Sequence, residues 1–291
     1  MFQEMVAERK IRKLSGDEIK HELLLMLKKF VLICEANQLT YFLSGGTLLG
    51  AIRENGFIPW DDDIDLMMPR VDYEKLRSIL KTNSFDLIAQ DYENCSFHTN
   101  LFLKIVNPNF LVVEPQRYAY KNFDPQSSFL FIDIFPIDGV PFNKMMQSLF
   151  FRKIKFYQTL IKLTAIDYRL YVETGGVLQK LKLPLKRFIG SVFSFLGVNS
   201  TIFLKKLDMF SQKYNYNQSE MVAACTGMNG RKEIVPRTAF SQCSTATFED
   251  QEYSIPVGYD VYLTNLYGEY MQRPEKSERS NHFNGEVYQV M

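Results

Sequence analysis

A run of carboxylates at residues 61–65 has the residue types and the spacing to do chemistry. It contains Asp61, Asp62, Asp63 and Asp65. Alternate side chains of a strand share a face, so Asp63 and Asp65 would point the same way while Ile64 enters the core. Two carboxylates side by side repel each other unless a positive charge compensates them. Mg²⁺ takes oxygen ligands of this kind, usually together with substrate phosphates, so the spacing predicts a metal-assisted phosphoryl site.

A glycine turn precedes the carboxylates. The segment Ser44-Gly45-Gly46-Thr47 follows an apolar run, residues 41–43, and precedes a helical pattern over residues 48–54. Backbone N–H groups at a helix N-terminus suit an anion. The order of strand, glycine turn and helix therefore predicts a phosphate-binding turn beside the metal site.

A third carboxylate, Asp133, interrupts the apolar run of residues 129–135. A charge in a buried strand is costly unless it is paired or bound to a metal. Asp133 is therefore predicted as a third ligand beside Asp63 and Asp65, the alternative being a residue that caps a turn at the end of the strand. We interpret Asp138, which precedes Gly139, as such a cap. Asp61 and Asp62 are open to two interpretations, a simple loop or support for the metal ligands.

The elements that must position these residues follow a mixed α/β pattern. Ser15 and Glu18 have the spacing of a capping box, and a helix is expected over residues 17–37. Further helices are expected over residues 48–54, 72–80 and 259–267. Strands are expected over residues 39–43, 64–68, 85–89, 100–106, 111–114, 129–135 and 248–255. Residues 1–14 have little to anchor them, and the tail after Pro274 is expected to be irregular.

The middle of the chain is helical and basic. Helices are expected over residues 143–172, 177–196 and 201–215, and residues 144–210 contain 12 Lys and Arg against three acids. The rest of the chain has 22 basic and 30 acidic residues. Such an asymmetry favours either a surface that meets an anionic partner or a solvated, Lys-rich face.

One hypothesis for this middle part is contact with anionic lipid headgroups. It would use apolar residues interspersed with Arg152, Lys153, Lys155 and Lys162. The apolar residues are Phe150, Phe151, Ile154, Leu160, Ile161 and Leu163. The alternative is an ordinary helical subdomain packed on the sheet. The predicted division is a catalytic core over residues 1–141, the basic helical subdomain over 142–218, and a part over 219–291 that completes the core.

The remaining composition favours a cytoplasmic protein, with a peripheral position at the inner face of the cell membrane as the alternative. The four cysteines form no CxxC pair, and the three histidines form no zinc pattern. We expect no signal peptide, and residues 188–198, the longest uncharged apolar stretch, are too short to span a bilayer. No nucleic-acid partner is expected.

Two long motifs resemble the LicD family, the bacterial phosphocholine transferases related to fukutin and fukutin-related protein. The first motif consists of Ser44 to Gly50 together with Gly56 to Asp65. The second runs from Ile132 to Pro141. A weaker match is Leu266-Tyr267-Gly268, followed by Arg279 and His282. The resemblance implies a nucleotidyltransferase-like mixed sheet flanked by helices, an α/β (α+β) fold, with a helical insertion. It also implies CDP-choline, or a related CDP-alcohol, as the donor.

A mechanism follows from the resemblance and from the physics of phosphoryl transfer. Mg²⁺, or Mn²⁺, held by Asp63, Asp65 and Asp133 would stabilise the attacking and leaving oxygens, and Asp133 would act as the base. The expected reaction transfers phosphocholine to a sugar hydroxyl of a teichoic acid or other surface glycan, which can be a lipid-linked precursor, and releases CMP. The alternatives are another CDP-alcohol such as CDP-ribitol, a plain nucleotidyltransferase that releases pyrophosphate, a DxD glycosyltransferase and an inactive nucleotide-binding module.

Several further residues are candidates for substrate binding. Arg53 lies just past the glycine helix and is expected to meet phosphate. Lys104 lies on an apolar strand and faces either solvent or the site. Trp60 is a candidate for an aromatic cage around choline, although most aromatic residues in this chain should form core. The full set predicted to bind substrate is Ser44, Gly45, Gly46, Thr47, Arg53, Trp60, Lys104, Arg279 and His282, the last two through the resemblance alone.

Overall fold

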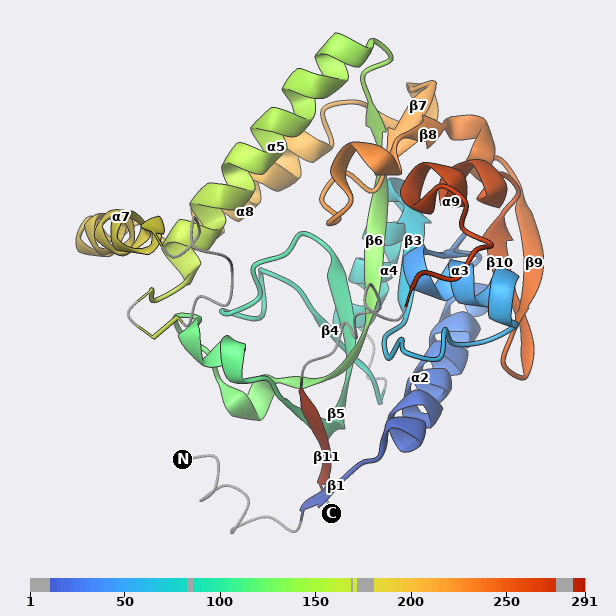
Figure 1. Cartoon of the computed structure of the whole chain (residues 1–291), viewed down its shortest axis with the longest axis horizontal. Coiled ribbons are helices and arrows are strands. Elements are labelled where there is room, and N and C mark those ends of the chain that lie inside the picture. The colour runs from blue at the N-terminus through green and yellow to red at the C-terminus, as the bar shows by residue number, and fades with distance from the viewer. Residues whose placement is uncertain (1–10, 83–85, 169, 172–180, 276–284, 291) are drawn as a thin grey trace.

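The structure is a computed structural model that describes residues 11–82, 86–168, 170–171, 181–275 and 285–290 (Figure 1). In the first half of the chain the elements are β1 (Ile11–Lys13), α2 (Gly16–Ala36), β2 (Phe42–Leu43), α3 (Gly45–Glu54), β3 (Asp65–Pro69), α4 (Arg70–Thr82), β4 (Ile88–Gln90), β5 (Leu103–Val113) and β6 (Phe129–Val140). They are followed by α5 (Lys144–Ala165), α7 (Leu183–Phe195), α8 (Ser200–Ser211), β7 (Met221–Ala223), β8 (Val235–Pro236), β9 (Cys243–Phe248), β10 (Gln251–Pro256), α9 (Tyr259–Tyr267) and β11 (Glu286–Val290). The short 3₁₀ helices are η1 (Pro115–Ala119), η2 (Pro125–Ser127), η3 (Tyr216–Gln218), η4 (Gly230–Glu233) and η5 (Arg237–Phe240).

The centre of the fold is a mixed, nine-stranded sheet. Its main path runs β1-β11-β5-β6-β3-β2, while β4 pairs with β5, and β7 joins β6 to β8. Strands β3 and β6 are parallel, whereas β6 is antiparallel to β5. Helices flank this sheet (Figure 1), which confirms the predicted α/β class.

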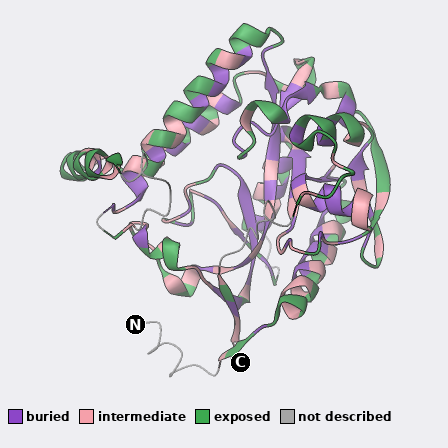
Figure 2. Cartoon of the chain, viewed as in Figure 1, coloured by how far each residue is buried: buried purple, intermediate pink, exposed green. Residues whose placement is uncertain are grey.

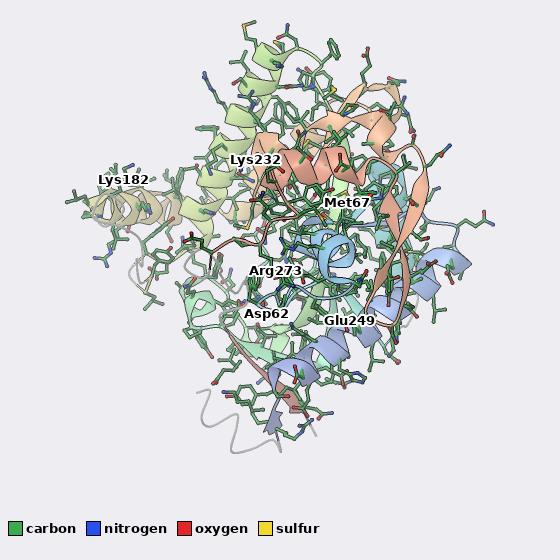
Figure 3. The ribbon with its side chains drawn as sticks, turned by 45° about the vertical axis from the view of Figure 1, so that its right-hand side comes forward. Asp62, Met67, Lys182, Lys232, Glu249 and Arg273 are labelled. Carbon is green, nitrogen blue, oxygen red and sulfur yellow. The ribbon has the colours of Figure 1, made fainter. Side chains whose placement is uncertain are left out.

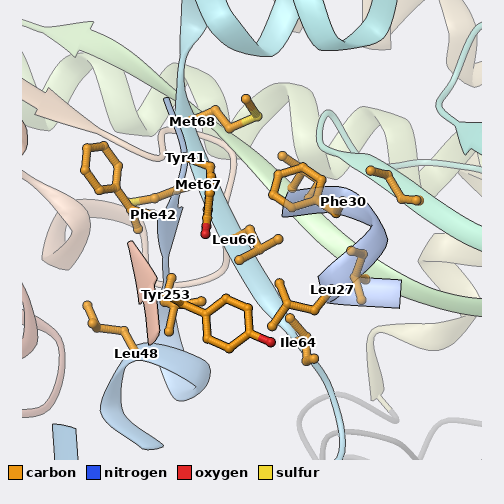
Figure 4. Packing of buried hydrophobic residues seen from close by; sticks show 14 of the residues in the cluster. Leu27, Phe30, Tyr41, Phe42, Leu48, Ile64, Leu66, Met67, Met68 and Tyr253 are labelled. Carbon is orange, nitrogen blue, oxygen red and sulfur yellow. The ribbon is translucent and has the colours of Figure 1, made fainter. Parts of the chain in front are cut away.

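The two faces of β6 differ in burial. Ile132 and Ile134 are fully buried in the main core. The residues that alternate with them, Phe131, Asp133 and Phe135, are half-buried. Helices α2 and α4 both pack against β6. Figure 4 shows part of the core, with side chains of α2 next to those of β3. The alternation leaves one face of β6 for packing and the other for a site.

Helix α2 forms as the sequence predicts. Ser15 caps it, and its hydroxyl accepts a hydrogen bond from the Glu18 amide while the Glu18 carboxylate accepts one from the Ser15 amide. Its buried side chains recur with helical spacing at Leu23, Met26, Leu27, Phe30, Ile33 and Cys34. The capping box therefore fixes the start of the helix, and the apolar stripe fixes the side that packs on the sheet.

Predictions for three parts of the chain were wrong. The strand predicted over residues 248–255 is a hairpin, β9 and β10, because Glu249 turns the chain at φ +57°. The two strands predicted over 100–106 and 111–114 form one irregular strand, β5. Residues 11–13 and 286–290, expected to be unanchored and irregular, form β1 and β11, and β11 pairs with both β5 and β1. Short, partly polar strands such as β1 and β11 have too little apolar alternation to be recognised in a sequence.

The hypothesis that the apolar residues of α5 face lipid was wrong. The alternative, a helix packed on the sheet, is correct. Phe150, Phe151, Ile154 and Ile161 are buried in a second core between α5, α8 and the sheet. Basic residues of α5 such as Lys153 remain exposed on the other side of the helix. Figure 2 shows these two sides of α5. The division of the chain at residues 141 and 218 stays a prediction.

Among the described helices, none is by itself long and apolar enough to cross a bilayer. Only α7 and α8 taken together, which bend by 98° at their junction, reach the required length and composition.

Candidate active site

Three neighbouring strands bring charged residues into one row across the sheet. Asp65 at the start of β3 is the register partner of Asp133 on β6. Asp133 is in turn the partner of Lys104 on β5, which pairs with Gln90 on β4. Register partners point to the same face of a sheet. The row therefore lies on the half-buried face of β6 and brings together Asp65 and Asp133, which are far apart in the sequence.

Lys104 enters the site rather than solvent. Its Nζ lies 2.7 Å from Oδ1 of Asp133, and both side chains are largely buried. The same Nζ lies 3.0 Å from the centre of the Phe131 ring. Burial lowers the pKa of Lys104, and the Asp133 carboxylate opposes that shift. Burial raises the pKa of Asp133, and Lys104 opposes that shift in turn. Each partner thus stabilises the charge of the other inside the sheet.

Asp65 has no such partner. Burial raises the pKa of its carboxyl group well above the usual value, and the charges of Asp63, Asp133 and Asp61 raise it further. Among the described residues, no donor forms a hydrogen bond to the Asp65 carboxylate. The negative charge at this end of the row is therefore under-compensated in the protein alone.

The glycine turn packs directly against these carboxylates. A Cβ on Gly46 would lie 2.4 Å from Oδ2 of Asp61, and one on Gly45 would lie 3.2 Å from Oδ2 of Asp65. Gly45 also has φ +51°, a left-handed conformation that favours glycine. The turn therefore needs glycine twice, once for its backbone angle and once for the close approach of a carboxylate.

Ser44 and Thr47 hold the turn in place with bonds to the scaffold. The Asp65 amide donates to the Thr47 hydroxyl at 2.9 Å, and the Ser44 amide donates to the Asp65 carbonyl at 3.0 Å. The Ser44 hydroxyl lies 3.1 Å from the Tyr262 hydroxyl, which donates to the buried carboxylate of Glu233 at 3.0 Å. These bonds fix α3 against β3 and α9, and their contribution to substrate binding stays a prediction.

A pocket of about 480 Å³ opens beside the turn. Its lining includes Gly46, Arg53, Trp60 and Asp61 from residues 44–65. The C-terminal part of the chain contributes Tyr267, Glu269, Tyr270, Gln272, Arg273, Pro274 and Glu275. The pocket therefore adjoins the glycine turn and combines aromatic rings with carboxylates.

Arg53 is held on one side by the scaffold. Its Nε lies 2.9 Å from Oε1 of Glu54, and its Nη1 donates to the Tyr270 carbonyl at 2.9 Å. Glu54 also pairs with Arg273. Nη2 of Arg53 is buried without a hydrogen-bond partner. The predicted phosphate contact would fall to this one nitrogen, and it stays a prediction.

The carboxylates suit a divalent cation, although they are not arranged as a finished site. No three His, Cys, Asp or Glu side chains in the described ranges form a complete set of metal ligands. Oδ1 of Asp61, however, is buried and has no hydrogen-bond partner. Burial raises the pKa of Asp61, which marks its charged form as unfavourable in this place. A cation among these oxygens would offset that cost, so a metal on Asp63, Asp65 and Asp133 remains the prediction.

The remaining sequence predictions divide three ways. Asp138 does not cap a turn: it lies in β6, buried, and accepts from Nε and Nη2 of Arg70 at 2.8 and 2.6 Å. Arg279 and His282 lie outside the described residues. Sequence reasoning missed Phe131, and it named Tyr267 only as part of a weaker motif, without a role in the site. The spacing of Phe131 two residues before Asp133 on one strand could have placed it on the site face.

The comparisons with known proteins agree with this geometry. Residues 38–162 match the profile of the family described as LicD/FKTN/FKRP, nucleotidyltransferase domain. A curated protein of Haemophilus influenzae, "Lipopolysaccharide cholinephosphotransferase LicD", is 28% identical over 285 residues, which cover 96% of this chain and 99% of that protein. An uncharacterized protein of Rickettsia prowazekii is 29% identical over 107 residues, 30% of this chain and 40% of that protein. The glycine turn, the acidic loop and strand β6 all lie in the matched segment, and residues 38–162 therefore form a LicD-family domain.

Proposed function

We propose that the chain transfers phosphocholine from CDP-choline to a sugar hydroxyl of a surface glycan and releases CMP. One observation carries this proposal: Asp65, Asp133 and Lys104 form a single row beside the N-terminus of α3. The row supplies both signs of charge that phosphoryl transfer needs. The similarity to the Haemophilus cholinephosphotransferase over almost the whole chain supports phosphocholine as the cargo.

Each charged residue of the row has its own proposed task. Asp133 accepts the proton of the acceptor hydroxyl, whose oxygen forms the new bond to the phosphorus that bears choline. The bond from that phosphorus to the bridging oxygen breaks, and CMP leaves with the bridging oxygen. Lys104 holds the Asp133 carboxylate in place and faces the phosphates. When bound by Asp63, Asp65 and Asp133, Mg²⁺ or Mn²⁺ would supply positive charge at the phosphate oxygens.

The pocket beside Trp60 is the proposed place for choline. Trp60, Tyr267 and Tyr270 supply aromatic ring faces, and Asp61 and Glu269 supply negative charge. A quaternary ammonium is attracted to both kinds of group. The two arginines of the pocket, Arg53 and Arg273, share the Glu54 carboxylate, which offsets part of their positive charge. We expect Trp60→Leu to raise KM for CDP-choline about tenfold and Trp60→Phe to raise it less.

The acceptor is the less defined half of the reaction. The name of the Haemophilus relative makes a lipopolysaccharide saccharide the first acceptor to test. A teichoic acid saccharide is the second, since both offer a sugar hydroxyl. The predicted cytoplasmic location stays a prediction.

The test is to incubate purified protein with CDP-choline, Mg²⁺ and each acceptor, and to measure CMP and phosphocholine-modified glycan. Asp133→Asn and Asp65→Asn should each reduce turnover at least 100-fold, a typical loss for one catalytic group. Asp86→Asn is the matched control, because Asp86 is exposed and pairs with Lys29 on the surface. It should leave turnover unchanged.

Other products would overturn the proposal in specific ways. CMP from CDP-ribitol but not from CDP-choline would keep the chemistry and replace the cargo. Pyrophosphate from CTP would indicate a plain nucleotidyltransferase. Nucleotide binding without any turnover would indicate an inactive module.

A further inference from the structure

Helix α7 carries an apolar stripe that no described part of the protein covers. The stripe consists of Leu185, Phe188, Val192 and Phe195, which are between 40% and 91% exposed. Their spacing of three, four and three residues places them on one side of an α-helix. Leu181, just before the helix, is 70% exposed and continues the same spacing. Soluble surfaces show single exposed apolar residues, but an aligned row of this length calls for an occupant.

The opposite side of α7 attaches the helix to the rest of the protein. Gly190 is buried there, where an added Cβ would lie 3.3 Å from the Leu163 carbonyl and 3.6 Å from the Tyr168 ring. Nε of Arg187 donates to the Tyr168 carbonyl at 2.9 Å. A half turn of helix separates Gly190 from the middle of the stripe. The stripe therefore points away from the body, from which α7 projects (Figures 1 and 2).

The charge around the stripe is positive. Lys182 is exposed beside it at the start of α7, whereas Lys186 and Arg187 meet Tyr168 on the attached side. Residues 144–210 as a whole contain 12 basic residues against three acids. The rest of the chain is acidic, with 22 basic and 30 acidic residues. Figure 3 shows Lys182 on α7, well apart from Asp62 beside the active site. The positive charge thus accompanies the apolar stripe and not the catalytic row.

We propose that α7 docks on an anionic lipid bilayer, with the stripe in the interface and the basic residues at the headgroups. An amphipathic helix binds in this way when apolar burial and attraction to anionic lipid act together. The same charge disfavours a second copy of the chain as the occupant, because two strongly basic regions would face each other. The inference is independent of the proposed transfer reaction, since no stripe residue lines the pocket at the glycine turn.

The test is sedimentation of the full chain with vesicles of phosphatidylcholine alone or with 30% phosphatidylglycerol. We expect binding to the anionic vesicles that falls at least tenfold in Phe188→Asp/Phe195→Asp, because the apolar area is replaced by negative charge. Phe188→Leu/Phe195→Leu should retain most binding. Leu32→Asp/Met228→Asp is the matched control, since both residues are exposed but lie off α7. It should bind like the unmodified chain.

Charge is tested separately. Lys182→Gln should weaken binding to anionic vesicles about fivefold, the effect of one basic residue near such a surface. Equal binding to both kinds of vesicle, or loss in the Leu32→Asp/Met228→Asp control, would overturn the proposal.

Sedimentation velocity without lipid separates the bilayer from a protein occupant. A monomer is expected. A dimer that Phe188→Asp/Phe195→Asp disperses would show that the stripe is a seam between two copies, which would also overturn the proposal. Thermal unfolding of each variant checks that the fold is intact, which the exposure of all substituted residues favours.

Discussion

Replacing Asp65 by Asn should stabilise the metal-free protein while it removes transfer activity. The Asp65 carboxylate is buried next to Asp63, Asp133 and Asp61, and this environment raises its pKa well above the usual value. In the described residues no donor forms a hydrogen bond to that carboxylate, so the amide loses no bond that the carboxylate had. Removing the charge should therefore relieve repulsion, and the new amide N–H₂ group has neighbouring carboxylates as acceptors.

The size of the effect follows from the register of β3 and β6. Asp65 and Asp133 are partners on adjacent strands, and adjacent strands lie about 4.8 Å apart. At an effective dielectric constant of about 20, two unit charges at that distance repel by about 3 kcal/mol. Lys104, 2.7 Å from Asp133, offsets part of this repulsion. We expect Asp65→Asn to raise the free energy of unfolding by about 1–2 kcal/mol.

The assay is urea unfolding at pH 7.5 in EDTA, repeated with Mg²⁺. The exposed control Asp86→Asn should shift the free energy of unfolding by no more than about 0.5 kcal/mol. With Mg²⁺ at about 100 times its Kd, the unmodified chain should gain about 2.7 kcal/mol, and Asp65→Asn should gain much less. The order of stability of the two proteins should therefore reverse between EDTA and Mg²⁺.

Two results would refute this reasoning. A lower stability of Asp65→Asn in EDTA would mean that the carboxylate is stabilised in the protein alone, so the charges around Asp65 are not crowded. An equal gain of both proteins with Mg²⁺ would mean that the cation binds elsewhere.

Three further predictions concern other parts of the molecule. Burial lowers the pKa of His98 from 6.5 to about 4. Between pH 6.5 and pH 4 the unfolded chain therefore binds a proton more readily than the folded chain does. The free energy of unfolding should fall by about 2 kcal/mol from pH 7 to pH 5. In urea unfolding, His98→Gln should not show this decrease between pH 7 and pH 5. The same pH dependence in His98→Gln as in the unmodified chain would show that His98 is not the cause. Arg70→Met leaves buried Asp138 without its bidentate partner and should cost about 3–5 kcal/mol in urea unfolding, against less than 1 if the pair is unimportant. Gly46→Ala should displace the Asp61 carboxylate and reduce turnover at least tenfold with little change in stability; unchanged turnover would separate Asp61 from the site.

The sequence predicted the elements that have a strong periodic pattern or a specific turn. Helix α2 was recognised from its capping box and apolar stripe, and α9 from its own pattern, with bounds that match the structure. Strands β1 and β11 were missed because short, partly polar strands depend on their partners rather than on their own composition. The fold class could therefore be predicted, but the closure of the sheet by the two chain ends could not.

The site was predictable in its residue types but not in its pairings. Sequence spacing placed Asp63 and Asp65 together, and the buried charge of Asp133 pointed to the same site. It could not decide whether Lys104 faced solvent, because that depends on the register between β5 and β6. It also could not bring Tyr267 of α9 next to the glycine turn, since that contact joins segments more than 200 residues apart.

Strand β6 shows how the position along one strand separates chemistry from structure. Asp133 and Asp138 are five residues apart, an odd number, so a regular strand sends them to opposite faces. Asp133 shares its face with Lys104, which pairs with it, and with Asp65, whose own charge has no such partner. Asp138 meets Arg70 of α4 in a buried, bidentate pair that balances it. A compensated buried charge adds specificity to packing, whereas an under-compensated one remains available to a cation or a substrate. The alternation of one strand thus separates Asp133, the carboxylate that we propose for the reaction, from Asp138, the carboxylate that holds α4.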